Sequence, residues 1–319
     1  MLPFKPQQDT PSLGQERLNV AIACDDSGFI PTKENTPSLG GGRGEAWGEA
    51  PPYTFATQSL GLTTIVNARD LGGYRLPSGQ RIRRGMLLRG GSLAAASDAE
   101  LQRLSHEFRV ARIFDFRTAG EVQHAPDRPV AGATNIWMPA FDEKTMEMND
   151  LALPHEAYSD LFHWLPLHAA QPDVQHVARH MYTAMVDNEF SQVQYAGFLQ
   201  NIVATTDGAV YWHCSQGKDR TGLGAAFLLA ALGADRDLIL ADYLISNEYY
   251  RHDVETVSAQ VATEAERQVI LTFLGVNVTY FTLALDLIDS RYGGMDAFLR
   301  GPLCLDDNDI AVLRTRYLI

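Results

Sequence analysis

The residues from His213 to Gly222 have the types and spacing needed to hold a phosphate group and attack it. They read His-Cys-Ser-Gln-Gly-Lys-Asp-Arg-Thr-Gly, so that Cys214 and Arg220 enclose five residues. A cysteine thiolate is a strong nucleophile, and a guanidinium group presents a planar fork of N–H donors that matches two phosphoryl oxygens. This spacing therefore predicts that Cys214 attacks a phosphate monoester that Arg220 binds.

Two secondary-structure elements must position these side chains. The apolar run at 208–213 predicts a buried strand, and residues 222–232 predict an apolar helix that Gly233 ends. A short loop between a strand and a helix directs successive N–H groups at one point, where the helix dipole adds roughly half a positive charge. We expect this anion site and Arg220 to lower the pKa of Cys214 from about 8.5 to roughly 3.5–7.5.

The remaining loop residues have supporting roles. Gly217 permits a close approach of the backbone to the phosphate. Thr221 can donate its hydroxyl to the Cys214 sulfur, and His213 can orient the loop from behind. The predicted phosphate-binding positions are Ser215, Gln216, Gly217, Lys218, Asp219 and Arg220.

The pattern around this loop is typical of an α/β domain. Ser97 and Glu100 have the spacing of a capping box, which predicts a short helix. A buried strand is predicted at 110–116 and a helix at 192–204, and strands that alternate with helices imply a mostly parallel sheet covered by helices on both faces. The C-terminal part is predicted to be helical: Asp235 can cap one helix, and the apolar spacing at 278–288 marks another that ends at Gly293-Gly294.

Composition divides the chain into two parts. Residues 1–52 are rich in Gly, Pro, Ser and Thr, and we expect an extended or flexible arm there. Residues 53–319 are expected to form one catalytic domain. The segment at about 137–185 lacks a clean period, and we interpret it as a helical lid.

The net charge of −13, from 26 basic and 39 acidic residues, argues against a nucleic-acid partner. No apolar run reaches the roughly 18 residues of a transmembrane segment. The start of the chain lacks the pattern of a signal peptide, and three isolated cysteines favour a reducing compartment. We therefore expect a cytoplasmic protein, although export without a classical signal stays open, as does the oligomeric state.

The Cys-x5-Arg loop resembles the signature of the protein tyrosine phosphatase superfamily. Its fuller form, Cys-x-x-Gly-Lys-Asp-Arg-Thr-Gly, is similar to that of the bacterial and fungal branch of tyrosine and phosphoinositide phosphatases. The likeness covers about residues 60–319, with Ala68 and Phe116 as departures from the usual pattern. It includes Asn67-Ala68-Arg69-Asp70-Leu71-Gly72-Gly73-Tyr74, then Asp115-Phe116-Arg117-Thr118 with Glu121, and Tyr292-Gly293-Gly294 with Leu313-Arg314.

The resemblance implies a tyrosine-phosphatase-like fold and a phosphocysteine intermediate on Cys214, without a metal or another cofactor. It also implies a general acid, but the chain contains no Trp-Pro-Asp tripeptide. Asp219 is our first choice because the loop holds it beside the phosphate. Asp115 and Asp70 stay open as alternatives, although we expect both, with Arg69, to support the loop structurally.

The predicted substrate is a phosphorylated protein, most simply at phosphotyrosine, with dual specificity possible. The alternative is a phosphoinositide or inositol phosphate, for which Lys218 could bind a second phosphate; its other use is to steady Asp219, and we favour the first. A phospho-residue binding module without turnover is a rival from another class. Sulfur transfer and arsenate reduction use related loops, but His213 and Thr221 disfavour them.

Overall fold

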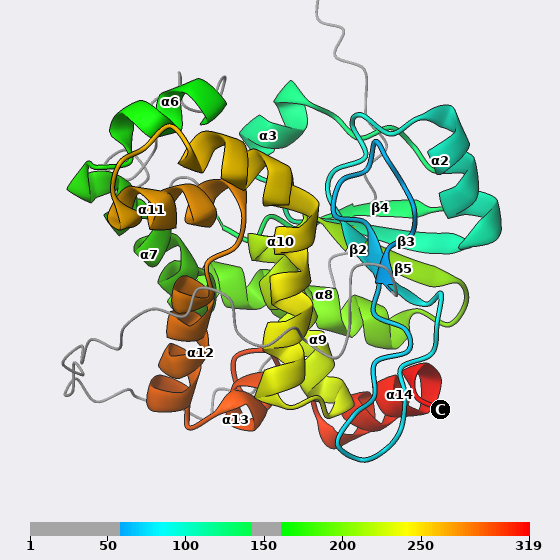
Figure 1. The fold of residues 1–319 in the computed structure, drawn as a ribbon. Helices are drawn as coiled ribbons and strands as arrows, with labels where there is room; N and C mark the ends of the chain where they lie inside the picture. The colour runs from blue at the N-terminus through cyan, green and yellow to red at the C-terminus, as the bar shows by residue number, and fades with distance from the viewer. Residues whose placement is uncertain (1–57, 142–160) are drawn as a thin grey trace, which may run out of the picture.

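The computed structural model describes residues 58–141 and 161–319. Five strands of this part form one sheet in the order β1-β2-β5-β3-β4 (Figure 1). β1 pairs with β2 in antiparallel orientation, whereas the other neighbouring strands are parallel. The bounds are β1 Arg69–Asp70, β2 Leu87–Gly90, β3 Val110–Asp115, β4 Thr134–Trp137 and β5 Ala209–His213. The mostly parallel sheet predicted from the sequence is confirmed.

The central strands of the sheet end together at one edge. β5 lies between β2 and β3, and its last residue, His213, pairs with Gly90 on one side and Asp115 on the other. Parallel strands present their carboxyl ends at the same edge, which is where ligands bind in open α/β sheets. The chain segments that follow these three residues are therefore brought together.

Both faces of the sheet are buried, because alternate residues of a strand point to opposite faces. On β5, Val210 and Trp212 join a large core with Phe114 of β3. Tyr211 joins a smaller core on the other face with Ile113. The central strands therefore contribute apolar side chains to both faces, as expected for a sheet covered on both sides.

Helices form the two outer layers and the C-terminal part of the molecule. The short helix α2 (Asp98–Gln102) and the π-helical turn η1 (Arg103–Glu107) lie on the side of the smaller core. On the other side, α8 (Glu189–Ala204) packs against α9 (Asp219–Leu232), and α14 (Asp307–Tyr317) contacts both (Figure 1). The remaining helices are α3 Ala119–His124, α6 Leu161–His168, α7 Pro172–Asp187, α10 Arg236–Ser258, α11 Glu264–Leu274, α12 Val278–Tyr292 and α13 Met295–Arg300.

Local signals in the sequence set several helix ends where we predicted them. The Ser97 hydroxyl accepts a hydrogen bond from the Glu100 N–H. The Glu100 carboxylate in turn accepts one from the Ser97 N–H, and the two bonds together form the predicted capping box. Asp235 caps α10, and Gly233 ends α9 with a left-handed φ of 98°. α8 begins three residues earlier than predicted because the Asn188 side chain caps it.

The predicted lid at 137–185 contains α6 and all but the last two residues of α7, and α7 packs beside α12 (Figure 1). Its residues 142–160, like the predicted arm at 1–52, lie outside the described residues. No single helix in the described ranges is long and apolar enough to cross a membrane; only α11 and α12, a bent pair, meet that criterion when joined.

Candidate active site

The loop at 214–220 follows the end of β5, as the sequence predicted, and its last two residues, Asp219 and Arg220, already form the start of α9, which begins three residues earlier than predicted. Gly217, at its centre, has a left-handed φ of 67°, which a residue with a Cβ rarely adopts. A Cβ there would also lie 2.1 Å from the Gly90 carbonyl carbon and 2.6 Å from the Gly91 nitrogen. The glycine is therefore required for both the loop conformation and its close contact with the end of β2.

The carbonyl groups of the loop are turned outward to donors from four other segments. Ser92 N–H donates to the Ser215 carbonyl at 3.2 Å, and the Tyr250 hydroxyl donates to the Gln216 carbonyl at 2.6 Å. The Gly217 carbonyl accepts hydrogen bonds from Asn67 and Arg89, each at 2.9 Å. Because a peptide N–H points opposite to its C=O, these bonds direct the N–H groups into the loop and form an anion cradle.

Cys214 lies at the base of this cradle, with only 2% of its surface exposed. Burial alone would raise the pKa of its thiol. The Arg220 guanidinium and the hydroxyl and N–H of Thr221 outweigh burial, so the pKa lies below its ordinary value. The Thr221 hydroxyl is buried and makes no aligned hydrogen bond among the described residues, so its bond to the sulfur stays a prediction. These contacts favour the thiolate that a nucleophilic cysteine requires.

Arg220 is held by Glu121 of α3 through both terminal nitrogens, with Nη2 at 2.8 Å from Oε1. The Phe141 ring lies 5.1 Å from the guanidinium carbon and the Ser215 hydroxyl also donates to Glu121. The ion pair opposes the cost of burial and keeps the pKa of Arg220 above its usual value. One bidentate pair uses two of the five N–H donors, so the remaining donors can still bind a phosphate.

Asp219 is the first residue of α9, and its side chain is 15% exposed. The Tyr182 hydroxyl of α7 donates a hydrogen bond to Asp219 Oδ1 and also shares one with the Tyr243 hydroxyl. The Lys218 ammonium lies 4.0 Å from Asp219 Oδ2. The carboxylate is thus fixed beside the cradle by a tyrosine that sequence analysis did not single out.

Lys218 is buried rather than directed at the mouth of the loop. Its ammonium donates to the carbonyl group of Phe273, in the last turn of α11, and to that of Gly275, just after this helix, the latter at 2.9 Å. Burial lowers the pKa of Lys218, and the nearby Asp219 carboxylate partly opposes this. We predicted two uses for this lysine, binding a second phosphate of the substrate or steadying Asp219. Its buried position favours the second use.

A buried ion network supports the loop from the side of β1 and β2. Asp242 of α10 pairs with Arg69 Nε at 3.1 Å and with Arg89 Nη1. Arg89 in turn donates to the Gly217 carbonyl, and Arg69 donates to the Asn67 side-chain oxygen. Burial lowers the pKa of Arg89 to about 10, and the positive charge of Arg69 adds to that effect. Arg69 thus acts on the loop indirectly, as a structural support.

The two alternative general acids are held by partners outside the loop. Asp70 accepts the N–H groups of Gly72 and Gly85 at 2.7 and 2.8 Å, which shapes the turn after β1. Asp115 is held by Arg117, whose Nε lies 2.9 Å from Asp115 Oδ1. Both carboxylates therefore stabilise local structure, whereas Asp219 lies within the loop itself.

Sequence reasoning missed several residues that hold the loop, among them Asp127, Tyr182, Asp242 and Tyr250. They lie far from the loop in sequence and follow no local pattern. Glu121 did have a signal, because Thr118-x-x-Glu121 is a capping-box spacing. Glu121 completes that box at the start of α3, which places its carboxylate beside Arg220.

Cys304 lies in the turn after α13 and is disulfide-bonded, which corrects our expectation of isolated thiols. Cys24 is outside the described residues.

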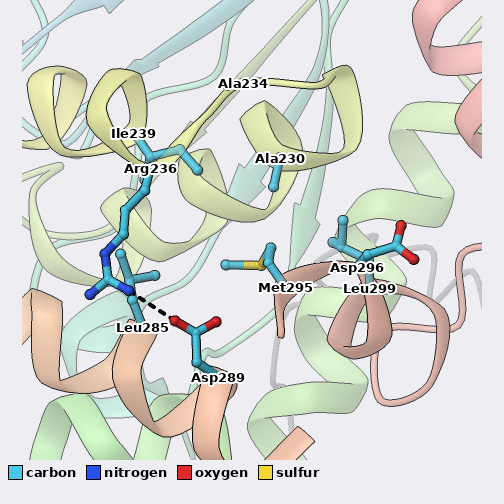
Figure 2. Close-up of a pocket in the computed structure, with 9 residues that line it drawn as sticks. All are labelled: Ala230, Ala234, Arg236, Ile239, Leu285, Asp289, Met295, Asp296 and Leu299. Carbon is cyan, nitrogen blue, oxygen red and sulfur yellow. Dashed lines mark hydrogen bonds and ion pairs between the residues drawn. The ribbon is translucent and has the colours of Figure 1, made fainter. Parts of the chain in front are cut away.

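A cavity of about 360 Å³ lies away from the loop, between α9, α10, α12 and α13 (Figure 2). Arg236 and Asp289 form an ion pair on its wall, and none of the predicted site residues lines it.

The fold and the site together define a cysteine-dependent phosphatase, and comparison with known proteins agrees. The sequence profile of the tyrosine phosphatase family matches residues 60–319. A Cupriavidus necator protein provisionally named a tyrosine-protein phosphatase is 35% identical over 263 residues, which cover 81% of this chain and 88% of the relative. The triple specificity protein phosphatase PtpB of Mycobacterium tuberculosis is 28% identical over 242 residues, covering 69% and 86%.

The chain belongs to the tyrosine phosphatase family. It is therefore a phosphoric monoester hydrolase, which is the enzyme class that the sequence predicted. Its substrate is a phosphorylated molecule.

Proposed function

We propose that the protein hydrolyses phosphotyrosine in proteins through a phosphocysteine intermediate on Cys214. The observation that carries this proposal is the outward arrangement of the loop carbonyls, which leaves inward N–H groups around a thiol of lowered pKa. The thiolate attacks phosphorus while the cradle and Arg220 stabilise the negative charge on the phosphoryl oxygens. Water then releases phosphate from the cysteine.

Asp219 is the group that we assign as general acid. It protonates the leaving oxygen in the first step and, as a carboxylate, accepts a proton from water in the second. Its position at the start of α9 and its hydrogen bond from Tyr182 support this assignment. Asp70 and Asp115 are engaged by backbone groups and by Arg117.

A phosphoinositide substrate is the second candidate, and the presence of Lys218 in the loop is the feature that favours it. For this role Lys218 would have to leave the Phe273 and Gly275 carbonyls. We prefer protein phosphotyrosine, and the names of the Cupriavidus necator and Mycobacterium tuberculosis relatives fit that preference.

The covalent intermediate can be trapped directly. Wild-type enzyme mixed with a phosphotyrosine peptide and quenched in acid should carry a phosphoryl group on the Cys214 peptide, as seen by mass spectrometry. Cys214→Ser should lose turnover yet still bind the peptide, because an alkoxide is much harder to form than a thiolate and the N–H cradle is retained. EDTA should not change the rate. Turnover retained by Cys214→Ser would exclude the mechanism.

A further inference from the structure

His213, directly before Cys214, is completely buried and is surrounded by charged groups. Its Nε2 lies 3.0 Å from Asp127 Oδ2, in the segment between α3 and β4. Its Nδ1 lies 3.1 Å from the Cys214 carbonyl oxygen and 3.8 Å from Asp115 Oδ1. Arg117 contacts both carboxylates, at 2.7 Å from Asp115 and 3.0 Å from Asp127.

The positions of these acceptors decide the protonation state of the ring. A carbonyl oxygen can only accept a hydrogen bond, so the His213 Nδ1 that contacts the Cys214 carbonyl carries a hydrogen. A ring with hydrogens on both nitrogens is the imidazolium cation. The Nε2 contact to Asp127 is a close ion-pair contact rather than an aligned hydrogen bond, and a carboxylate at 3.0 Å favours a proton on Nε2 as well, which makes His213 a cation.

The charge balance of the cluster leads to the same conclusion. Asp115 and Asp127 carry two negative charges, and Arg117 supplies one positive charge. A protonated His213 makes the buried group neutral, which avoids the high cost of an uncompensated buried charge. Burial alone would lower the pKa of His213, but Asp115 and Asp127 outweigh burial and the repulsion from Arg117, raising it to about 8.

Three residues of this cluster also have the spacing of potential metal ligands. Asp115, Asp127 and His213 are the one group of described residues whose potential ligand atoms lie within 4.8 Å of one another. The Arg117 guanidinium already contacts both carboxylates. A metal ion at this position would have to displace the buried Arg117 guanidinium from both of these carboxylates.

The charged ring has two effects on the catalytic loop. Its bond to the Cys214 carbonyl turns that carbonyl outward, so the Ser215 N–H points into the cradle. Its positive charge lies one residue from the sulfur and favours the thiolate. Asp127 also accepts the Leu93 N–H at 2.8 Å, which fixes the carboxylate in place.

We propose that Asp127 is a positioning residue for the phosphatase reaction, which keeps His213 as an imidazolium behind Cys214 and thereby stabilises the thiolate. This inference rests on the proposed role of Cys214 as nucleophile. Neither of the two measurements described below requires turnover. A failure of this inference can therefore be distinguished from a failure of the proposed function.

The wild-type protein provides the first test. The full chain is labelled with ¹⁵N-histidine, and the His213 ring signals are assigned by their loss in His213→Gln. We expect both ring nitrogens to be protonated at pH 7, with a titration midpoint near 8. A neutral His213 ring at pH 7 would overturn the proposal, whatever the stability of any variant.

The second test measures the thiolate in Asp127→Asn. The amide can donate to Nε2, so the ring can lose its charge and keep its Nδ1 hydrogen on the Cys214 carbonyl. We expect the pH midpoint of Cys214 alkylation by iodoacetamide to rise by about one unit, a rate loss of about tenfold below the midpoint. Alkylation is followed on the Cys214 peptide by mass spectrometry.

Two further variants separate this effect from a general structural one. Asp98→Asn removes an exposed carboxylate that pairs with Arg128 and should leave the alkylation midpoint unchanged. In a His213→Gln background, Asp127→Asn should cause no additional rise, because the charge it supports is already absent. An unchanged midpoint in Asp127→Asn, or an equal rise in both backgrounds, would contradict the assigned role.

Discussion

The hydroxyl of Tyr182 on α7 donates a hydrogen bond to the carboxylate of Asp219, the first residue of the helix after the catalytic loop. Tyr182 is completely buried, and its ring lies edge-on to Phe281 of α12. The predicted lid segment therefore contributes a polar contact to the proposed general acid. The orientation of that acid depends on how α7 packs.

Removing this hydroxyl should impair acid catalysis. We expect Tyr182→Phe to lower kcat about tenfold on phenyl phosphate, part of the 10²- to 10⁴-fold that general acid catalysis supplies. The loss should be much smaller on an activated aryl phosphate, whose leaving group needs little protonation. Tyr280→Phe, a change in a neighbouring ring 6.3 Å away, is the matched control. Equal losses on both substrates would indicate a packing defect.

The assignment of Asp219 itself is tested with the same pair of substrates. Asp219→Asn should slow phenyl phosphate and phosphotyrosine hydrolysis about a hundredfold or more and affect the activated ester much less. Steady-state kinetics with both leaving groups provides the measurement. If the two rates fall together, Asp115→Asn becomes the next variant to examine.

Lys218→Ala should leave substrate preference unchanged if the lysine is structural. The variant leaves the Phe273 and Gly275 carbonyls without their donor, so we expect a loss of about 1–3 kcal/mol in unfolding free energy. The ratio of kcat/KM for phosphotyrosine peptides and phosphoinositides is the decisive quantity. A tenfold selective loss on phosphoinositides would instead show that the ammonium reaches a second phosphate.

Asp242→Asn should be strongly destabilising. The change leaves Arg69 and Arg89 buried without a counterion, and breaking a buried pair in this way costs about 3–5 kcal/mol. Urea unfolding gives the free energy of unfolding. Asp286→Asn, which removes an exposed partner of Arg236, should cost no more than about 1 kcal/mol.

The titration of His213 should appear in the pH dependence of stability. Its pKa is raised from 6.5 to about 8 by folding, so the stabilisation is complete below pH 6.5 and is lost as pH rises through 8. The shift corresponds to about 2 kcal/mol. Unfolding free energies at pH 6 and pH 9 should therefore differ by less in His213→Gln than in the wild type. A difference of equal size in both proteins would show that other groups cause it.

The sequence was sufficient for those features that depend on neighbouring residues. The loop, the strand before it and the helix after it are contiguous, and their turn and capping signals are local. Asp235, Gly233 and the Ser97 capping box could be placed for the same reason.

The supports of the loop could not be predicted because they depend on long-range packing. Asp242 lies 173 residues from Arg69, and Glu121 lies 99 residues from Arg220. The short strands β1, β2 and β4 were also missed, since two to four residues carry little periodicity. The direction of the Lys218 side chain is set by two carbonyl groups at the end of α11, 55 and 57 residues away in the sequence.

The contact between Gly217 and Gly90 bears on how the enzyme recognises its ligands. At this point one backbone lies directly against another, so no side chain can change rotamer to relax the loop. The cradle is therefore already shaped before a substrate arrives, and little ordering entropy is spent when an oxyanion enters. Rigid tetrahedral or trigonal-bipyramidal anions that fit this shape should gain affinity from it.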